Sequence, residues 1–343
     1  MSQPNSQGKK RWLLSYTFTL VILACTACSS IPVNPPLAPI SHPLAPSTQK
    51  LPGEEIWKNG VSSFLFGTND TQEWSEKNLE TQPAIQKYIR NAGFTVIRSF
   101  FQDNASDAAI EQRITAIENS GAQCLGVIFN IFNVSYDEHL VQYLGNRCLM
   151  YEFGNEPDYN NISVETYLKQ WNTVIPILRH INPGATFIGP AASTSSGSFI
   201  QDFLTGVKSS GVLPDAISFH WYPCSHDSQE DCLNMAGTAG QEALQIRSAV
   251  KNILGKDLPI GITEWNFDPG NPPPSYGDQS SFITSFSKAA LQSMIQAGVT
   301  VACQFDAASF AGYGHLDMFN INNDTPKAQY YAIKSIIDTY RPS

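Results

Sequence analysis

The sequence predicts an α/β protein folded as a single (β/α)8 barrel, in which eight parallel strands close into a ring surrounded by helices. Residues 56–343 repeat one pattern, a short apolar run followed by a polar loop and a helical stretch. Eight such repeats within this length match the size of a (β/α)8 barrel. The rival arrangement is a doubly wound open sheet, which usually carries a glycine fingerprint after its first strand. The stretch FLFGTNDTQEW supplies no such fingerprint, and the barrel is therefore favoured.

Eight apolar runs are expected to form the strands, and the stretches between them show helical spacing. The runs cover residues 62–69, 94–101, 124–133, 148–155, 185–193, 216–223, 258–267 and 300–309. One helix is expected to bury a face of isoleucines and the last helix a face of larger residues: Ile110, Ile114 and Ile117, then Tyr330, Ile333, Ile337 and Tyr340. Thr325 before Pro326 is the expected N-cap and first turn of that last helix. Pro176 conflicts with the fourth helix and is expected to kink it.

Residues 1–28 are predicted to be an export signal that takes no part in the fold. Three basic residues (KKR) precede the apolar run WLLSYTFTLVILA, and the small residues ACTACSS follow it. This is the order of charged, apolar and small segments in a secretory signal, and the apolar run is short for a membrane span. The cysteine after small residues resembles a bacterial lipoprotein cleavage site, which Cys28 fits better than Cys25. We expect the protein to be lipid-anchored at the cell surface through Cys28, with simple secretion or an uncleaved anchor as the alternatives.

Residues 29–55 are predicted to be a proline-rich tether between this signal and the barrel. The segment contains PVNPPLAPISHPLAP, in which the tetrapeptide PLAP occurs twice. Proline at this density removes backbone donors and keeps a chain extended. A signal, a tether and a globular body together suit a protein held at a cell surface.

The overall charge argues against two classes of partner. The formal net charge is −9, which opposes nucleic acid and anionic membrane surfaces as main partners. The composition is otherwise globular, with 42% apolar and 15% charged residues, enough for a large core. We expect no nucleic-acid partner, membrane contact only through the lipid anchor, and a monomer.

Two glutamates end expected strands at positions where chemistry is found in barrels. Glu156 lies in YEFGNEPD at the end of the fourth strand, and Glu264 lies in LPIGITEWNF at the end of the seventh. A barrel brings these strand ends to the same mouth, where active sites of this fold lie. Either residue alone could be an ordinary solvated or salt-bridged loop residue. Two carboxyls that converge suit glycoside hydrolysis, in which one protonates the leaving oxygen and the other attacks or stabilises the anomeric carbon.

The motifs NEP and TEW at these two strand ends resemble the retaining (β/α)8 glycosidases of clan A, a superfamily with cellulase-like and family 39-like members. The resemblance covers the whole body of the chain. It implies that Glu156 is the acid/base, that Asn155 hydrogen-bonds the sugar 2-hydroxyl, and that Glu264 is the nucleophile. It further implies a retaining enzyme that cleaves β-glycosidic bonds of an extracellular poly- or oligosaccharide through a covalent glycosyl-enzyme.

Three further residues match supporting positions of the same clan. Arg98 in VIRSF stands where the clan often has an arginine that supports the nucleophile, and a guanidinium among barrel strands needs an acidic partner such as Glu264. His220 and Tyr222 in SFHWYP match a histidine and tyrosine of strand six. Residues two apart on a strand face the same side, and both can therefore point into the mouth, with Tyr222 near Glu264.

Aromatic and amide side chains near the strand ends are candidates for sugar contacts. Trp265 follows the nucleophile and is the expected stacking platform, because aromatic rings pack on pyranose faces. Trp221 is a second candidate. Core packing is the alternative for Trp221, Trp265 and Phe305. Asn130 in the third run and Gln304 in the eighth are candidate polar contacts. The eighth run departs from the clan pattern, since CQFDAASF lacks the tryptophan that many members have there, and this weakens any assignment as a cellulase.

No metal or other cofactor is expected. His220 could be paired with Asp227 or His226 as ligands, but HWYPCSHD has no recognised ligand spacing. The alternative function is a non-catalytic, surface-tethered carbohydrate-binding barrel. Turnover of aryl β-glycosides or β-glucans would separate this alternative from the enzyme.

The cysteines of the barrel are expected to have structural roles. Cys224 and Cys232 lie in one exported loop that a disulfide could staple. Cys124 and Cys148 open neighbouring strands, and a second bridge is therefore possible. Cys303 is then left over as a small buried apolar residue. The sequence leaves both pairings open.

Overall fold

The computed structural model describes residues 47–70, 79–270, 272–307, 314–320 and 322–342. All of these belong to one compact unit. The predicted export signal, Cys28 and residues 29–46 of the predicted tether lie outside the described residues. Residues 47–55, also predicted as tether, pack on the barrel: the Ser47 hydroxyl donates to the carbonyl of Asp257 at 2.6 Å, and Leu51 is buried in one apolar cluster with residues of the strands. Among the described helices, none has the length and apolar character that crossing a membrane requires.

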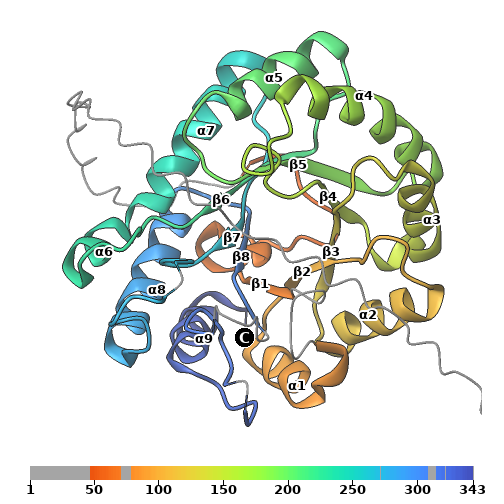
Figure 1. The fold of residues 1–343 in the computed structure, drawn as a ribbon. Helices are drawn as coiled ribbons and strands as arrows, with labels where there is room; N and C mark the ends of the chain where they lie inside the picture. The colour runs from red at the N-terminus through yellow and green to blue at the C-terminus, as the bar shows by residue number, and fades with distance from the viewer. Residues whose placement is uncertain (1–46, 71–78, 271, 308–313, 321, 343) are drawn as a thin grey trace, which may run out of the picture. The chain divides into compact units, whose positions relative to one another are not determined.

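Eight parallel strands close into a ring in sequence order, which confirms the predicted (β/α)8 barrel (Figure 1). They are β1 (Gly67–Asp70), β2 (Val96–Phe100), β3 (Gln123–Ile128), β4 (Met150–Phe153), β5 (Thr186–Ala192), β6 (Ala216–Trp221), β7 (Ile260–Trp265) and β8 (Val301–Gln304). The ring closes where β1 pairs with β8 in parallel. Closure brings all eight carboxyl ends to one mouth.

Helices surround the ring on its outside (Figure 1). In the described part of the chain they are α1 (Pro83–Ala92), α2 (Asp107–Asn119), α3 (Val134–Leu144), α4 (Val164–Ile181), α5 (Phe199–Ser210), α6 (Gln229–Met235), α7 (Thr238–Leu254), α8 (Ser280–Gln296) and α9 (Ala328–Tyr340). Short 3-10 turns are η1 (Lys58–Gly60), η2 (Ser63–Leu65), η4 (Leu79–Thr81) and η5 (Gly145–Arg147). The short α6 is an addition between β6 and α7 to the simple strand–helix repeat.

The strands divide their side chains between two apolar layers. Residues that face outward pack against the helices, whereas a smaller cluster fills the inside of the ring: Leu51, Phe64, Val96, Leu125, Met150, Ile188, Ala216, Val301 and Cys303. In β2, Val96 belongs to the inner cluster and Ile97 to the outer one. Because side chains alternate along a strand, Arg98 points into the ring above Val96. The inner apolar cluster therefore forms the floor of the mouth.

The expected elements are confirmed in kind, with corrections at their bounds. The first expected strand begins later, because residues 63–65 form η2 instead. The third ends at Ile128, and α3 begins at Val134. The helix α4 continues through Pro176 as one element.

The predicted start of the last helix is wrong. α9 begins at Ala328, after Lys327 as its N-cap residue. Pro326 instead pairs with Phe319 in an isolated β-bridge, and the Thr325 hydroxyl donates to Asn323 Oδ1 at 2.6 Å. The chain is therefore held extended by these contacts for two residues beyond the position that the Thr-Pro pattern indicated.

Both disulfides that the sequence left open are present. Cys124 is bonded to Cys148, with Cα atoms 5.0 Å apart, and the bond joins the beginning of β3 to the segment that enters β4. Cys224 is bonded to Cys232 in the segment after β6. Cys303 is free and buried inside the ring, as expected.

Candidate active site

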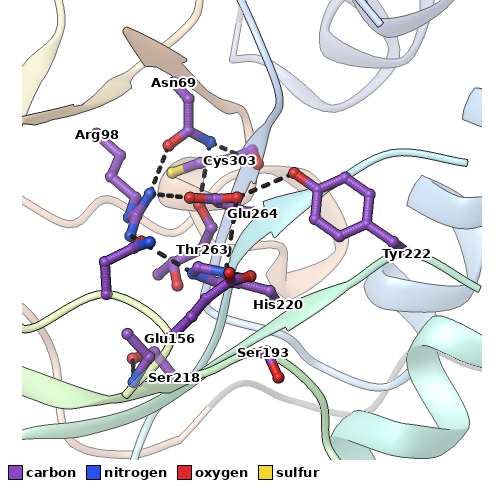
Figure 2. Close-up of polar contacts among 12 residues, drawn as sticks. Asn69, Arg98, Glu156, Ser193, Ser218, His220, Tyr222, Thr263, Glu264 and Cys303 are labelled. Carbon is purple, nitrogen blue, oxygen red and sulfur yellow. Dashed lines mark hydrogen bonds and ion pairs between the residues drawn. The ribbon is translucent and has the colours of Figure 1, made fainter. Parts of the chain in front are cut away.

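Arg98 is the centre of the polar network in the barrel mouth (Figure 2). It is fully buried, and its guanidinium contacts five side chains. Nε donates to Glu152 at 2.5 Å, and Nη1 donates to Glu264 Oε1 at 2.6 Å and to Asn69 Oδ1 at 2.9 Å. Nη2 donates to Asn155 Oδ1 at 2.7 Å and lies 3.4 Å from His220 Nε2. Burial alone would lower the pKa of Arg98, but the two carboxylates raise it above its ordinary value.

Glu264 receives a hydrogen bond on each carboxylate oxygen. Arg98 donates to Oε1, and the Tyr222 hydroxyl donates to Oε2 at 3.0 Å. Burial, with the charges of Glu264 and Glu156, raises the pKa of Tyr222 well above its ordinary value, so the phenol keeps its proton. The two donors hold the Glu264 carboxyl in one orientation, and Arg98 and Tyr222 both lie against it, as the sequence predicted.

The inward direction of Glu264 depends on an irregularity in β7. Ile260 and Ile262 belong to the outer apolar layer, and strict alternation from Ile262 would turn Glu264 outward as well. The pairing of β7 with β8 shifts register between Ile262 and Trp265. Such shifts re-aim side chains at barrel rims, and here the shift accompanies a carboxylate that faces Arg98.

Glu156 lies in the loop after β4, in a backbone conformation that its side-chain type rarely adopts. Its φ is 45°, in the left-handed region, at a cost of about 1–3 kcal/mol for a non-glycine residue. Its N–H donates to the carbonyl of Ala191 at 2.9 Å, and its own carbonyl accepts from Asn160 Nδ2 at 3.1 Å. The side chain then reaches His220, whose Nδ1 lies 2.8 Å from Glu156 Oε1.

The contacts of His220 determine where its proton sits. Arg98 can only donate hydrogen bonds, so Nε2 of the neutral imidazole is the acceptor and Nδ1 carries the proton toward Glu156. Burial works against the charged ring, whereas the carboxylates of Glu264 and Glu156 raise the pKa of His220 from its ordinary value. His220 thus donates to Glu156 Oε1 and leaves Oε2 as the oxygen of that carboxyl available to a ligand.

The two glutamates converge as the sequence predicted. One oxygen of Glu156, one of Glu264 and a ring nitrogen of His220 all lie within 4.8 Å of one another. Three such groups could ligate a metal ion, but the Arg98 guanidinium 2.6 Å from Glu264 places a positive charge where a cation would have to bind. The arrangement instead suits a pair of carboxyls that act on one bond between them.

Comparison with known proteins places this site in a family. A sequence model described as glycosyl hydrolases family 39 matches residues 140–339, more than half of the chain. The chain belongs to glycosyl hydrolases family 39. It is therefore a glycosidase, and both converging glutamates lie within the matched region. No curated protein sequence matches the chain.

Solved structures similar to this family 39 protein share its barrel. A glucosidase from Croceicoccus marinus has a TM-score of 0.64 at 18% identity, over 86% of this chain and 68% of that one. A monomeric β-xylosidase from Caulobacter crescentus CB15 has a TM-score of 0.61 at 15% identity, over 80% and 67%. An endo-β-1,3-glucanase from Amycolatopsis mediterranei has a TM-score of 0.51 at 19% identity, over 78% and 98%. At these identities the likeness shows the fold.

Two buried polar residues of the family 39 site were not found from the sequence. Glu152 lies within β4 and pairs with Arg98 Nε. Asn69 lies in β1, accepts from Arg98 Nη1 and donates to the carbonyls of Thr263 and Cys303 at 3.1 Å. Asn69 joins β1, β7 and β8 to the arginine (Figure 2). The available signal was a charged residue inside an apolar run and an asparagine near a strand end.

A third residue not found from the sequence is Asp158, two positions after the acid/base candidate Glu156. Asp158 accepts two hydrogen bonds from Ser193 at the end of β5, from the backbone N–H to Oδ1 at 2.9 Å and from Oγ to Oδ2 at 2.7 Å. These two hydrogen bonds hold the loop that contains Glu156 against the end of β5. The available signal was the second carboxylate of NEPD.

The remaining predicted residues divide between the mouth and the core. Asn155 lies in the mouth, on Arg98. Trp221 does not reach it, because its ring stacks on Phe286 of α8, and its Nε1 donates to Glu242. Gln304 is buried and donates to Gln329 Oε1 at 2.8 Å. Trp265 is almost fully buried. Trp221 and Gln304 therefore have structural positions, contrary to their predicted contacts with the substrate. The Trp265 side chain has too little exposed surface to support its predicted stacking on a sugar.

Asn130 lines a cavity next to this network. The cavity, of about 370 Å³, lies between the loops that follow β2, β3 and β4. Its lining includes Asp103, Phe132, Asn155 and Asn160. Asn130 donates to Asp103 Oδ2 at 3.0 Å and accepts from the N–H of Phe132 at 3.2 Å. We refer to it as the β3–β4 cavity, and it adjoins the Arg98 network through Asn155.

Proposed function

We propose that this protein is a retaining β-glycosidase that acts on a poly- or oligosaccharide outside the cell. The observation that carries the proposal is the separation of the two carboxyls, which have one oxygen each within 4.8 Å of the other. Retaining enzymes hold their carboxyls about 5–5.5 Å apart, whereas inverting enzymes leave about 6.5–9.5 Å for a water molecule. The shorter separation supports direct attack by one of the two.

Glu264 is the proposed nucleophile. Its carboxylate attacks the anomeric carbon and forms an ester as the bond to the leaving oxygen breaks. Arg98 and Tyr222 orient the carboxylate before the attack, because both donate hydrogen bonds to it. The same two donors stabilise its negative charge again when the ester is broken. The Arg98 cation is itself fixed by Glu152 and Asn69, which keeps it from moving as charge leaves and returns.

Glu156 is the proposed acid/base. In the first step, a proton on Oε2 passes to the leaving oxygen, since His220 donates to Oε1. In the second step, the resulting carboxylate takes a proton from water, whose oxygen attacks the anomeric carbon and breaks the ester to Glu264. The sugar is released with the anomeric configuration it had in the substrate, and Glu156 is protonated again.

A β-linkage is supported by the clan resemblance of the NEP and TEW motifs and by two structural neighbours. Those neighbours are a β-xylosidase and an endo-β-1,3-glucanase. Asn155, fixed by Arg98 at 2.7 Å, is the proposed partner of the sugar 2-hydroxyl. The complete acid/base and nucleophile pair favours an enzyme over a carbohydrate-binding barrel without activity.

Proton NMR of the first-formed product tests the proposal. The full chain is incubated with β-1,3-, β-1,4- and β-1,6-glucans, mannan, xylan and aryl β-glycosides, and the anomeric signals are followed before mutarotation. The β anomer is expected to appear first from whichever substrate is cleaved. First release of the α anomer would contradict the retaining assignment.

We also propose that the chain is exported and anchored by a lipid on Cys28, with secretion as the alternative. The support is the leader sequence alone, with KKR, a short apolar run and a cysteine among small residues. Intact-mass measurement of the mature protein should find an acylated N-terminal Cys28, and Cys28→Ala should release the protein or leave its precursor uncleaved. A mature N-terminus elsewhere would overturn the anchor and leave the barrel and its site untouched.

A further inference from the structure

We infer that the β3–β4 cavity is a subsite for a second, uncharged sugar unit, linked to the unit whose bond is cleaved and lying on its far side from the leaving group. This inference rests on the proposed function, because it uses the roles of Glu156, Glu264 and Asn155. It makes the substrate an oligo- or polysaccharide with at least two sugar units before the cleaved bond.

The directions of two neighbouring side chains give the side of the substrate. The carboxyl of Glu156 reaches His220 on β6, and the leaving oxygen must lie at that carboxyl. Asn155 instead reaches Arg98 on β2. In the closed ring, β2 stands directly across from β6, and β3 stands across from β7, which contains Glu264. The leaving group therefore departs toward β6, and the cavity lies on the opposite side.

The position of Asn155 extends this argument to the sugar ring. If Asn155 contacts the 2-hydroxyl, the carbons beyond C2 lie farther from the leaving oxygen and toward the cavity that Asn155 lines. A sugar attached through the oxygen on C3 or C4 would then continue into the cavity. Its volume of about 370 Å³ is ample for one such ring, at the lower end of the range for small-ligand pockets.

The lining of the cavity combines an exposed ring with oriented polar groups, as sugar recognition requires. Phe132 is 52% exposed, which is unusual for a large apolar side chain and leaves ring surface for a pyranose face. Asn130 and Asn133 both donate to Asp103, at 3.0 and 2.6 Å. These amides fix the Asp103 carboxylate, whose remaining lone pairs can accept from sugar hydroxyls.

The charge of the lining selects among sugars. Asp103 is the one ionisable residue among the described residues that line the cavity, and no lysine or arginine accompanies it there. A carboxylate accepts hydrogen bonds from neutral hydroxyls, but it repels a second carboxylate. A neutral hexose or pentose therefore fits this subsite, whereas a uronic acid does not.

Aryl β-glycosides with one or two sugar units test the subsite, because the aryl group is the leaving group and every sugar must lie on the cavity side. The probes are the aryl β-glucoside, β-xyloside, β-cellobioside, β-laminaribioside and β-xylobioside, with an aryl disaccharide whose outer unit is glucuronic acid. The quantity compared is the ratio of kcat/KM for the disaccharide to that for the matching monosaccharide. A ratio cancels any loss of folded protein.

The wild-type full chain should show a ratio of about tenfold or more for at least one neutral pair, as expected for one stacked and hydrogen-bonded ring. Phe132→Ala should bring this ratio close to one. Tyr331→Ala is the matched control, because Tyr331 is 59% exposed on α9, away from the cavity, and it should keep the wild-type ratio. The disaccharide with glucuronic acid should show no gain.

Two outcomes overturn the inference while leaving the proposed function intact. One is cleavage of the aryl monosaccharide with no gain from any second neutral unit. The other is a gain that Phe132→Ala does not reduce. Absence of aryl release from every probe would instead count against the proposed function, and the subsite would be rejected with it.

Discussion

Asp158 holds the loop that contains Glu156 against the end of β5. Removal of the Asp158 carboxylate should reduce the rate of acid catalysis strongly and the free energy of unfolding only modestly. The carboxylate accepts from the backbone N–H and the hydroxyl of Ser193, at 2.9 and 2.7 Å. Two residues earlier, Glu156 has a φ of 45°. The loop therefore stores strain directly beside the bonds that hold it in place.

The magnitude follows from these two opposing contributions. Hydrogen bonds to a charged group contribute about 1.5–3 kcal/mol each, whereas the left-handed conformation of Glu156 costs about 1–3 kcal/mol. Asp158→Ala removes both bonds, and nothing at this end of the loop then offsets the backbone strain at Glu156. The Glu156 carboxyl should therefore shift away from the leaving oxygen. General acid catalysis contributes about 10²–10⁴-fold, so we expect part of it, about 10–100-fold in kcat/KM, to be lost.

The assay is a series of aryl β-glycosides whose leaving groups differ in acidity. A dinitrophenyl leaving group needs no proton, and its kcat/KM should fall less than about threefold in Asp158→Ala. Poor leaving groups should show the full loss, so the rate should depend more steeply on leaving-group acidity than in the wild type. Ser193→Ala keeps the N–H bond and should show the same trend to a smaller degree.

An equal loss for all leaving groups would refute this reasoning. It would mean that Asp158 supports the barrel in general and does not position the acid. Urea denaturation of both variants separates the two cases further, since a positioning role predicts a large change in leaving-group dependence at a modest change in the free energy of unfolding.

Three other predictions concern stability. Arg98→Met leaves two buried carboxylates without their cation and should lower the free energy of unfolding by about 3–5 kcal/mol, with a smaller loss in a Glu152→Gln background; equal losses in the two backgrounds would exclude their pairing. Burial, with two nearby carboxylates, raises the pKa of Asp137 to about 8, so the folded state keeps a proton that the unfolded state has released above about pH 4. The free energy of unfolding should fall as pH rises from about 4 to about 8, by about 1.4 kcal/mol per pH unit. Urea denaturation should show that Asp137→Asn stabilises the protein most at about pH 8. A stabilisation that does not depend on pH would contradict this prediction. Replacement of Cys124 and Cys148 by serine should cost about 3 kcal/mol in the same measurement, whereas an unchanged midpoint would argue against the bridge.

The fold could be predicted because its signal is distributed along the chain. Each strand is an apolar run and each helix an apolar stripe, so errors at single positions, such as Thr325, move only an element's bound. The start of α9 depends on the local bridge of Pro326 to Phe319, which no periodicity contains. Burial of Ile110 and Ile333 in their helices needed only spacing.

The site could be predicted where its residues end strands. Glu156, Glu264, Arg98, His220 and Tyr222 all lie near strand ends or follow them closely, and ring closure brings them together. The inward direction of Glu264 still required the register shift in β7, which sequence alternation opposes. The motif therefore identified a residue that strand geometry alone would have placed outside the mouth.

Residues that the sequence placed wrongly or missed depend on neighbours across the ring. Trp221 follows His220 directly and so faces the other side of β6; alternation alone could have excluded it. Gln304 donates a hydrogen bond to Gln329 of α9, and this contact exists only once α9 has packed against the barrel. Glu152 and Asn69 act only through Arg98, and nothing local in their own segments indicates that partner.

Azide rescue of the two glutamate variants tests the central claim most directly. Glu156→Ala should still form the glycosyl-enzyme from a dinitrophenyl β-glycoside and then stall, and added azide, which needs no general base, should restore turnover and give a β-glycosyl azide. Glu264→Ala should not turn over in the absence of azide, because no covalent intermediate can form. The opposite result, an α-glycosyl azide from Glu264→Ala with a Glu156→Ala variant that stays inactive on activated substrates, would contradict the assignment of nucleophile and acid/base.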